Sequence, residues 1–96
     1  MVTIIASVKV KDGNMEIAKE VLKEIVSKVK ESEPGTLEYI PHTVKGSKFK
    51  NTILFYEVYK DKEALNLHMA NLAKNMKDFS PLLEPGMDMK TCFTIL

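Results

Sequence analysis

The stretch FYEVYKDKEALNLH, residues 55–68, contains a strand pattern followed directly by a helix pattern. Its first five residues are aromatic or β-branched except for Glu57, which interrupts an otherwise apolar strand. Asp61 then supplies an N-cap, and the apolar spacing after it predicts a helix over residues 62–79. In that helix His68 lies on the edge of the predicted apolar stripe. The stretch therefore predicts a strand–helix unit with a carboxylate and an imidazole where packing alone would favour apolar residues.

The same two patterns continue on both sides of this stretch. Alternating apolar residues predict a strand over residues 2–10, and apolar residues three and four apart predict a helix over residues 15–32, which Glu33-Pro34-Gly35 ends. Three further segments have a strand pattern and cover residues 36–44, 49–59 and 88–96. A polar hairpin connection over residues 45–48 joins the second strand to the third, and Pro41 indicates that the second strand has an edge position or a bulge.

The predicted element order is therefore β-α-β-β-α-β. Right-handed crossovers place both helices on one face of a four-stranded antiparallel sheet, which is the ferredoxin-like arrangement of the α+β class. A chain of 96 residues is long enough for one such domain and too short for two, so we expect a single domain over residues 1–96.

Both faces of the third strand are largely apolar. One face carries Ile53, Phe55, Glu57 and Tyr59, and the other carries Leu54, Tyr56 and Val58. Two helices cover only one face of a sheet, and a face open to water would carry polar residues in alternation. We therefore expect a second copy of the sheet to cover the far face in a two-fold homodimer.

Composition excludes several classes of partner. The chain is 45% hydrophobic and 28% charged, as in globular domains, and 14 basic and 13 acidic residues leave a net charge of +1 without a basic patch for nucleic acid. Cys92 is the one cysteine, so the chain can form no internal disulfide and no thiolate zinc site, and we expect Cys92 to be a small buried hydrophobe. The N-terminal apolar run is too short to span a bilayer and does not have the features of a signal peptide. We expect a cytoplasmic protein without a membrane partner.

Glu57 and His68 are the candidate functional pair. Burial of an unpaired carboxylate costs several kcal/mol, so Glu57 needs a partner or a hydrated cavity. Both residues also have structural interpretations, because Glu57 could form a salt bridge with a lysine and His68 could be a locally hydrogen-bonded, half-buried histidine. The functional interpretation places them on a cleft between the sheet and the helices. Four methionines suit an apolar pocket there, although they suit ordinary core packing as well: Met69, Met76, Met87 and Met89.

Two stretches of the chain carry a family resemblance. EPGTLEY, residues 33–39, and FYEVYKDKEAL, residues 55–65, followed by His68, resemble the signature stretches of the antibiotic biosynthesis monooxygenase family. The likeness covers nearly the whole chain and implies a dimeric α+β barrel of ferredoxin-like subunits. It also implies oxidation of quinols, anthrones and related phenols by molecular oxygen without a metal or flavin cofactor.

By this resemblance His68 and Glu57 occupy the recurring cleft positions of the family, and Tyr39 matches the tyrosine that ends its first motif. The hypothesis of an oxygenase then assigns roles to individual residues. His68 is expected to be the catalytic base, because an imidazole ordinarily titrates near neutral pH, and Glu57 is expected to orient or polarise it. The expected substrate contacts are hydrogen bonds from Tyr39 and Asn75 and ring stacking by Tyr56 or Tyr59. Tyr59 stands where many members have tryptophan, and the chain contains no tryptophan, which argues against the haem-degrading activity of some relatives.

Three functions stay open on the sequence alone. The favoured one is a cofactor-independent monooxygenase for a small quinol or aromatic phenol. The second is a proton-relay isomerase of a small carbonyl compound, such as the phosphorylated signal on which some relatives act. The third is a non-catalytic dimeric domain that binds a ligand or serves in a stress response.

Overall fold

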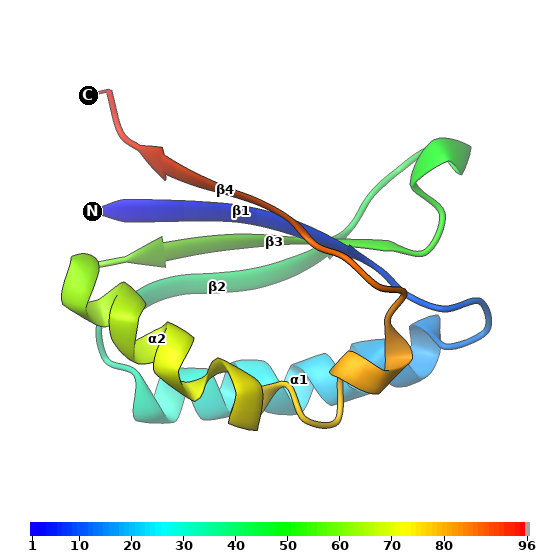
Figure 1. The fold of residues 1–96 in the computed structure, drawn as a ribbon, viewed down its shortest axis with the longest axis horizontal. Coiled ribbons are helices and arrows are strands. Elements are labelled where there is room, and N and C mark those ends of the chain that lie inside the picture. Colours follow the sequence, from blue (N-terminus) through cyan, green and yellow to red (C-terminus); the bar gives the residue numbers. More distant parts are fainter. Residues whose placement is uncertain (96) are drawn as a thin grey trace.

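The computed structural model describes residues 1–95 and has the predicted element order. Its main elements are β1 (Val2–Lys9), α1 (Met15–Ser32), β2 (Thr36–Thr43), β3 (Thr52–Tyr59), α2 (Lys62–Asn75) and β4 (Asp88–Phe93), with 3-10 turns η1 (Ser47–Phe49) and η2 (Ser80–Leu82). The four strands form one sheet in the order β2-β3-β1-β4, and every neighbouring pair is antiparallel. Both helices lie on the same face of the sheet (Figure 1), which confirms the ferredoxin-like prediction.

Three predicted boundaries were wrong by several residues. The third strand begins at Thr52 rather than residue 49, because η1 occupies the start of this segment and Asn51 has a left-handed φ of 64° that turns the chain. Helix α2 ends at Asn75 rather than residue 79, where a tight turn follows and Phe79 N donates to Met76 O at 3.0 Å. The last strand ends at Phe93, and position 96 of the predicted strand lies outside the described residues. Strands β1 and β2 end one residue before their predicted ends.

The helix-facing side of the sheet forms the core. In β3 the side chains of Ile53, Phe55, Glu57 and Tyr59 are buried beneath the helices. Strand β1 adds Ile4, Ala6 and Val8, and α1 adds Ala18, Leu22, Ile25 and Val29. The alternation of β3 therefore places Glu57 inside the apolar layer, on the same face as Ile53, Phe55 and Tyr59, as predicted.

Strand β2 lies at the edge of the sheet, which explains how it accommodates Pro41. Its pairing with β3 is irregular between Thr36 and Glu38, and the register then pairs Tyr39 with Glu57. Paired residues of neighbouring strands point to the same face, so this register turns both side chains toward the helices. Of the two alternatives that Pro41 indicated, the edge position is confirmed, whereas the irregular pairing lies near Thr36 and Pro41 itself pairs in register with Phe55.

A close contact holds the start of β2 against α2. A Cβ atom at Gly35 would lie 2.5 Å from Ala64 Cβ, so only glycine fits here without a shift of one of the two segments. Gly35 O also accepts a hydrogen bond from Lys60 N at 2.8 Å, just before α2 begins. Asp61 caps α2 as predicted, because its Oδ1 accepts from Ala64 N at 2.9 Å. The segment after α1 is thereby anchored next to α2.

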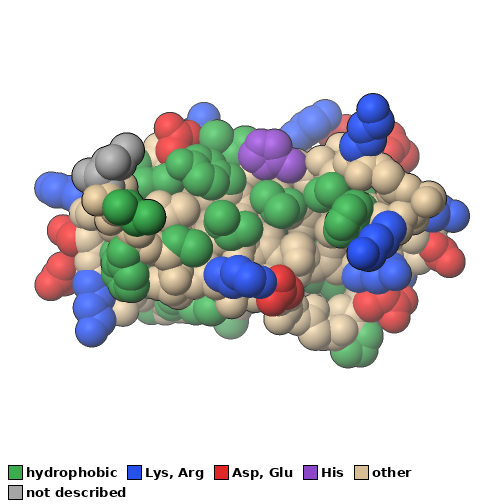
Figure 2. Space-filling model, turned by 90° about the horizontal axis from the view of Figure 1, so that it is seen from above, with side chains coloured by type: hydrophobic (Ala, Val, Ile, Leu, Met, Phe, Trp, Pro, Cys, Tyr) green, Lys and Arg blue, Asp and Glu red, His purple; other side chains and the backbone are tan. Residues whose placement is uncertain are grey.

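The far face of the sheet is open and partly apolar. Ile5, Tyr56 and Ile40 lie side by side across β1, β3 and β2, with exposed fractions of 38%, 40% and 41%. Figure 2 shows hydrophobic side chains gathered over this face, with charged groups mostly toward its rim. Among the described residues, neither helix has the length and apolar character required to cross a membrane.

Candidate active site

His68 lies buried between two carboxylates. Its side chain comes from the middle of α2, and its Nδ1 lies 2.8 Å from Glu33 Oε1 while its Nε2 lies 3.8 Å from Glu57 Oε1. The rings of Tyr39 and Tyr59 flank the imidazole, with centroid distances of 5.1 and 5.2 Å. His68 is 2% exposed and its hydrogen-bond partner lies 35 residues away in the chain, so the alternative interpretation of a half-buried, locally hydrogen-bonded histidine does not hold.

The predicted apolar stripe of α2 faces the sheet but is less buried than expected, with Leu65 and Met76 only partly buried against the core. Of the α2 residues, all of which the structure describes, His68 alone is buried, whereas Met69 is 43% exposed. The reason is that the apolar side chains of α2 border a cavity rather than a filled core. Met69, Leu72 and Met76 line that cavity, and Phe79, beyond the helix, is fully buried against Phe55.

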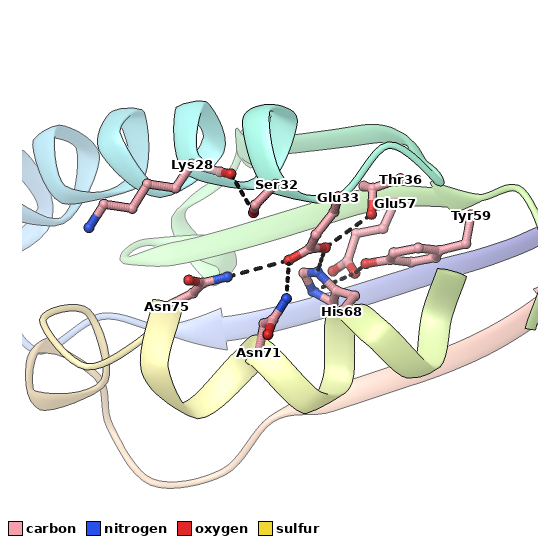
Figure 3. A network of polar contacts seen from close by, with 9 residues as sticks. All are labelled: Lys28, Ser32, Glu33, Thr36, Glu57, Tyr59, His68, Asn71 and Asn75. Atoms are coloured by element: carbon pink, nitrogen blue, oxygen red, sulfur yellow. Dashed lines mark hydrogen bonds and ion pairs between the residues drawn. The ribbon is translucent and has the colours of Figure 1, made fainter. Parts of the chain in front are cut away.

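Glu33 is a site residue that the sequence interpretation missed. It is 1% exposed and caps the end of α1, where its backbone N–H donates to Val29 O at 2.9 Å. Its carboxylate meets four side chains of the described residues: Thr36, His68, Asn71 and Asn75 (Figure 3). Glu33 had been interpreted only as part of a helix stop. The signal that could have identified it is its position as the first residue of the family-like stretch.

Glu57 is the second buried carboxylate, at 7% exposure. The Tyr59 hydroxyl donates to Glu57 Oε1 at 2.5 Å. Burial raises the pKa of the Glu57 carboxyl, the Tyr59 hydroxyl and His68 oppose that rise, and Glu33 adds to it. Among the described residues Glu57 has no lysine partner, so a salt bridge with lysine does not explain its burial.

The two buried tyrosines are held in their neutral form. Burial raises the pKa of Tyr39, and the nearby carboxylates of Glu57 and Glu33 raise it further. Burial also raises the pKa of Tyr59, with a further contribution from its hydrogen bond to Glu57. Both hydroxyls therefore keep their protons and can donate hydrogen bonds. The Tyr59 hydroxyl donates to Glu57.

A cavity of about 440 Å³ lies against this cluster, between the sheet and α2. Tyr39, Glu57 and His68 form its polar wall. The remaining lining is mainly apolar and includes Phe55, Leu72, Phe79 and the four methionines Met69, Met76, Met87 and Met89. This size and lining fit a small, mostly apolar ligand with one polar end.

The structure brings together only part of the predicted site. Tyr39, Glu57 and His68 share the cavity wall. Tyr59 is fully buried behind Glu57, and Tyr56 is 40% exposed on the opposite face of the sheet. Asn75 does not line the cavity; its amide donates to Glu33 Oε2 at 3.4 Å. The predicted stacking and substrate-binding roles of Tyr56, Tyr59 and Asn75 therefore have no counterpart in the cavity of the single chain.

The fold and the cluster define a small α+β protein with a buried acid–base group beside an apolar cavity. The family model described as antibiotic biosynthesis monooxygenase matches residues 1–79, and the chain belongs to this family. This finding confirms the resemblance drawn from the two sequence stretches.

Solved structures share the fold at low sequence identity. A candidate antibiotic biosynthesis monooxygenase from Caulobacter crescentus has a TM-score of 0.85 at 18% identity, with 99% of this chain and 90% of that chain covered. A second candidate of the same description, from Nitrosomonas europaea, has a TM-score of 0.79 at 16% identity, and both chains are fully covered at 100%. A Pseudomonas aeruginosa protein has a TM-score of 0.78 at 20% identity, with 99% of this chain and 94% of that chain covered. No curated protein matches the sequence.

Proposed function

We propose that the protein is a cofactor-independent monooxygenase that acts on a small quinol or aromatic phenol. One observation carries the proposal: an imidazole held between two buried carboxylates forms the wall of an apolar cavity of about 440 Å³. Membership of the antibiotic biosynthesis monooxygenase family supports the reaction class.

The proposed chemistry begins with a proton transfer. His68 takes the proton of a bound phenol, and the resulting phenolate or enolate is electron-rich enough to reduce molecular oxygen directly. One oxygen atom enters the substrate, the other leaves as water, and the substrate supplies all the electrons. The apolar walls exclude water from the reactive intermediate, and the Tyr39 hydroxyl on the same wall is placed to donate to a substrate oxygen.

The charge of the cavity favours an uncharged substrate. Its ionisable lining consists of Tyr39, Glu57 and His68, and among residues 1–95 no lysine or arginine lines it. A phosphorylated substrate would meet a carboxylate here and no cation. An aromatic phenol is therefore a better substrate than a phosphorylated carbonyl compound.

An isomerase of an unphosphorylated carbonyl compound is the second candidate. It is favoured by the separation of 3.8 Å between His68 Nε2 and Glu57 Oε1, which puts two proton carriers on one wall of the cavity. Such a pair could remove a proton at one carbon and return it at another. Turnover without oxygen distinguishes the two reactions, because the isomerase needs no oxygen and the oxygenase consumes it.

We also propose that the protein works as a homodimer whose sheets pack face to face. The apolar row Ile5, Tyr56 and Ile40 supports this arrangement, because each residue is more than a third exposed in the single chain. A partner sheet on that face would leave the cavity on the helix side accessible to a substrate. The dimer is thus compatible with the proposed reaction.

Oxygen uptake tests the function. Wild type is screened against a panel of quinols and anthrols, alongside His68→Ala and the control Asn66→Ala, which changes an exposed residue two positions earlier in α2. We expect substrate-dependent uptake that falls about 100-fold or more in His68→Ala and stays near wild type in Asn66→Ala. Equal uptake by wild type and His68→Ala would contradict the role of His68. Absence of any uptake together with substrate binding unaffected by His68→Ala would favour a non-catalytic domain.

A further inference from the structure

The Glu33 carboxylate is saturated with hydrogen-bond donors. Oε1 accepts from the Thr36 hydroxyl at 3.1 Å and contacts His68 Nδ1 at 2.8 Å. Oε2 accepts from Asn71 at 3.5 Å and Asn75 at 3.4 Å. An ionised carboxylate with these neighbours accepts on both oxygens, and an Nδ1 that faces it can form a hydrogen bond only by donating.

This contact decides which ring nitrogen of His68 is available for chemistry. When Nδ1 carries the proton of the neutral ring, Nε2 has the free lone pair. Nε2 is also the nitrogen closer to Glu57 Oε1, at 3.8 Å, and Glu57 lines the cavity. The lone pair is thus on the side of the ring where a substrate proton can reach it.

Glu33 acts on His68 from outside the cavity. It is absent from the cavity lining, although the structure describes it completely, and its contacts come from α2 and the start of β2 (Figure 3). The other titratable groups around His68 are Glu57 and Tyr59 of β3 and Tyr39 of β2. None of these three forms a hydrogen bond with His68 Nδ1. Glu33 is therefore the group that can decide which ring nitrogen carries the proton.

We propose that Glu33 is a positioning residue that fixes His68 in the tautomer protonated at Nδ1, and that Asn71 and Asn75 hold Glu33 in place. The catalytic part of this inference rests on the proposed function, because a free Nε2 matters only if His68 accepts a proton. The tautomer itself can be measured without any substrate.

The first test is nitrogen NMR of the His68 ring in wild type, followed through a pH titration. In the neutral form we expect Nδ1 to have the chemical shift of a protonated nitrogen and Nε2 that of an unprotonated one. A neutral ring with its proton on Nε2 would overturn the proposal, and this test requires no variant to fold.

The second test replaces the carboxylate by an amide in Glu33→Gln. An amide has one acceptor oxygen, so if that oxygen faces Asn71 and Asn75, its NH2 group faces His68 Nδ1 and requires a lone pair there. We therefore expect the neutral tautomer to shift toward protonation at Nε2. Glu31→Gln is the matched control, since Glu31 is exposed two residues earlier in α1 and should leave the shifts unchanged.

Kinetics completes the test once an oxidised substrate is known. Because Glu33 does not line the cavity, Glu33→Gln should lower kcat about 100-fold with little change in KM. Unchanged ring-nitrogen shifts in folded Glu33→Gln and in folded Glu33→Ala, which offers Nδ1 no side-chain acceptor, would overturn the positioning role, whatever the activity. Absence of quinol oxidation in wild type, with the expected shifts present, would refute only the proposed function.

Discussion

Glu33 and His68 belong to different halves of the chain and meet in a hydrogen bond of 2.8 Å between Oε1 and Nδ1. Glu33 closes α1, whereas His68 lies in the middle of α2, so the bond joins the two halves of the fold. It also divides the polar cluster into two sides. Glu33 with its asparagines lies behind the imidazole, and Glu57 lies in front of it at the cavity.

Replacement of Glu57 by glutamine should change the pH dependence of stability. Because burial raises the folded-state pKa of Glu57, its contribution to folding is fully present below the unfolded pKa and is lost as pH rises through the folded pKa. Glu57→Gln removes this loss and keeps an acceptor oxygen for Tyr59. We expect the stability of the variant relative to wild type to increase as pH rises from acidic to neutral.

Urea denaturation across that pH range measures the effect. Glu84→Gln is the control, because Glu84 is exposed and its removal should leave the pH profile of stability unchanged. A difference between Glu57→Gln and wild type that stays constant with pH would be inconsistent with a raised pKa for Glu57.

Loss of the Tyr59 hydroxyl should destabilise the protein more at neutral than at acidic pH. Tyr59→Phe removes the donor at 2.5 Å from Glu57 Oε1, and that donor lowers the Glu57 pKa. The cost of leaving a buried charged group short of a donor is about 1–3 kcal/mol, and protonation of Glu57 in acid reduces it. Unfolding free energies from urea titrations in acidic and neutral buffer should show this ordering. An equal cost at both pH values would argue that Glu57 does not ionise in the folded protein.

A side chain at position 35 should force β2 and α2 apart. The Cβ atom of Gly35→Ala would lie 2.5 Å from Ala64 Cβ, so we expect a loss of about 1–3 kcal/mol in the free energy of unfolding. Ala64→Gly removes the opposing methyl group at a cost of about 1 kcal/mol of helix propensity. The double variant should therefore be more stable than the sum of the two single changes predicts. If the two changes in unfolding free energy simply add, the contact between positions 35 and 64 is not the cause of the destabilisation by Gly35→Ala.

A charge on the open sheet face should disrupt the proposed homodimer. We expect wild type to sediment with twice the 10.9 kDa mass of one chain, and Tyr56→Lys to sediment as a monomer, because the lysine charge would be buried without a partner. Leu67→Lys is the matched control, since Leu67 is 45% exposed on α2, away from that face. Equal sedimentation of wild type and Tyr56→Lys would show that this face does not form a dimer interface.

The fold was predictable because local patterns determine it. Strand alternation and helix spacing were sufficient for the order of elements, and Pro41 indicated the edge position of β2. The boundaries near Asn51 and Asn75 were less predictable, because left-handed and tight turns there do not alter the apolar pattern.

The site was predictable only in part. Glu57 and His68 were visible as polar residues in apolar patterns, but Glu33 follows a helix end where a solvated carboxylate is the usual case. It is buried by tertiary contacts with His68, Asn71 and Asn75 of α2, which lie 35 or more residues away in the chain. The partial exposure of the apolar residues of α2 was missed for a similar reason, since residues that border a cavity have the same spacing as residues that fill a core.

The division of the cluster has a consequence for protein engineering. The four methionines line the pocket and take no part in the hydrogen bonds of Glu33, so their substitution can alter which molecules enter while the contact between Glu33 and His68 stays in place. Under the proposed function, libraries randomised at Met69, Met76, Met87 and Met89 would therefore vary the substrate range and leave the proposed catalytic base unchanged.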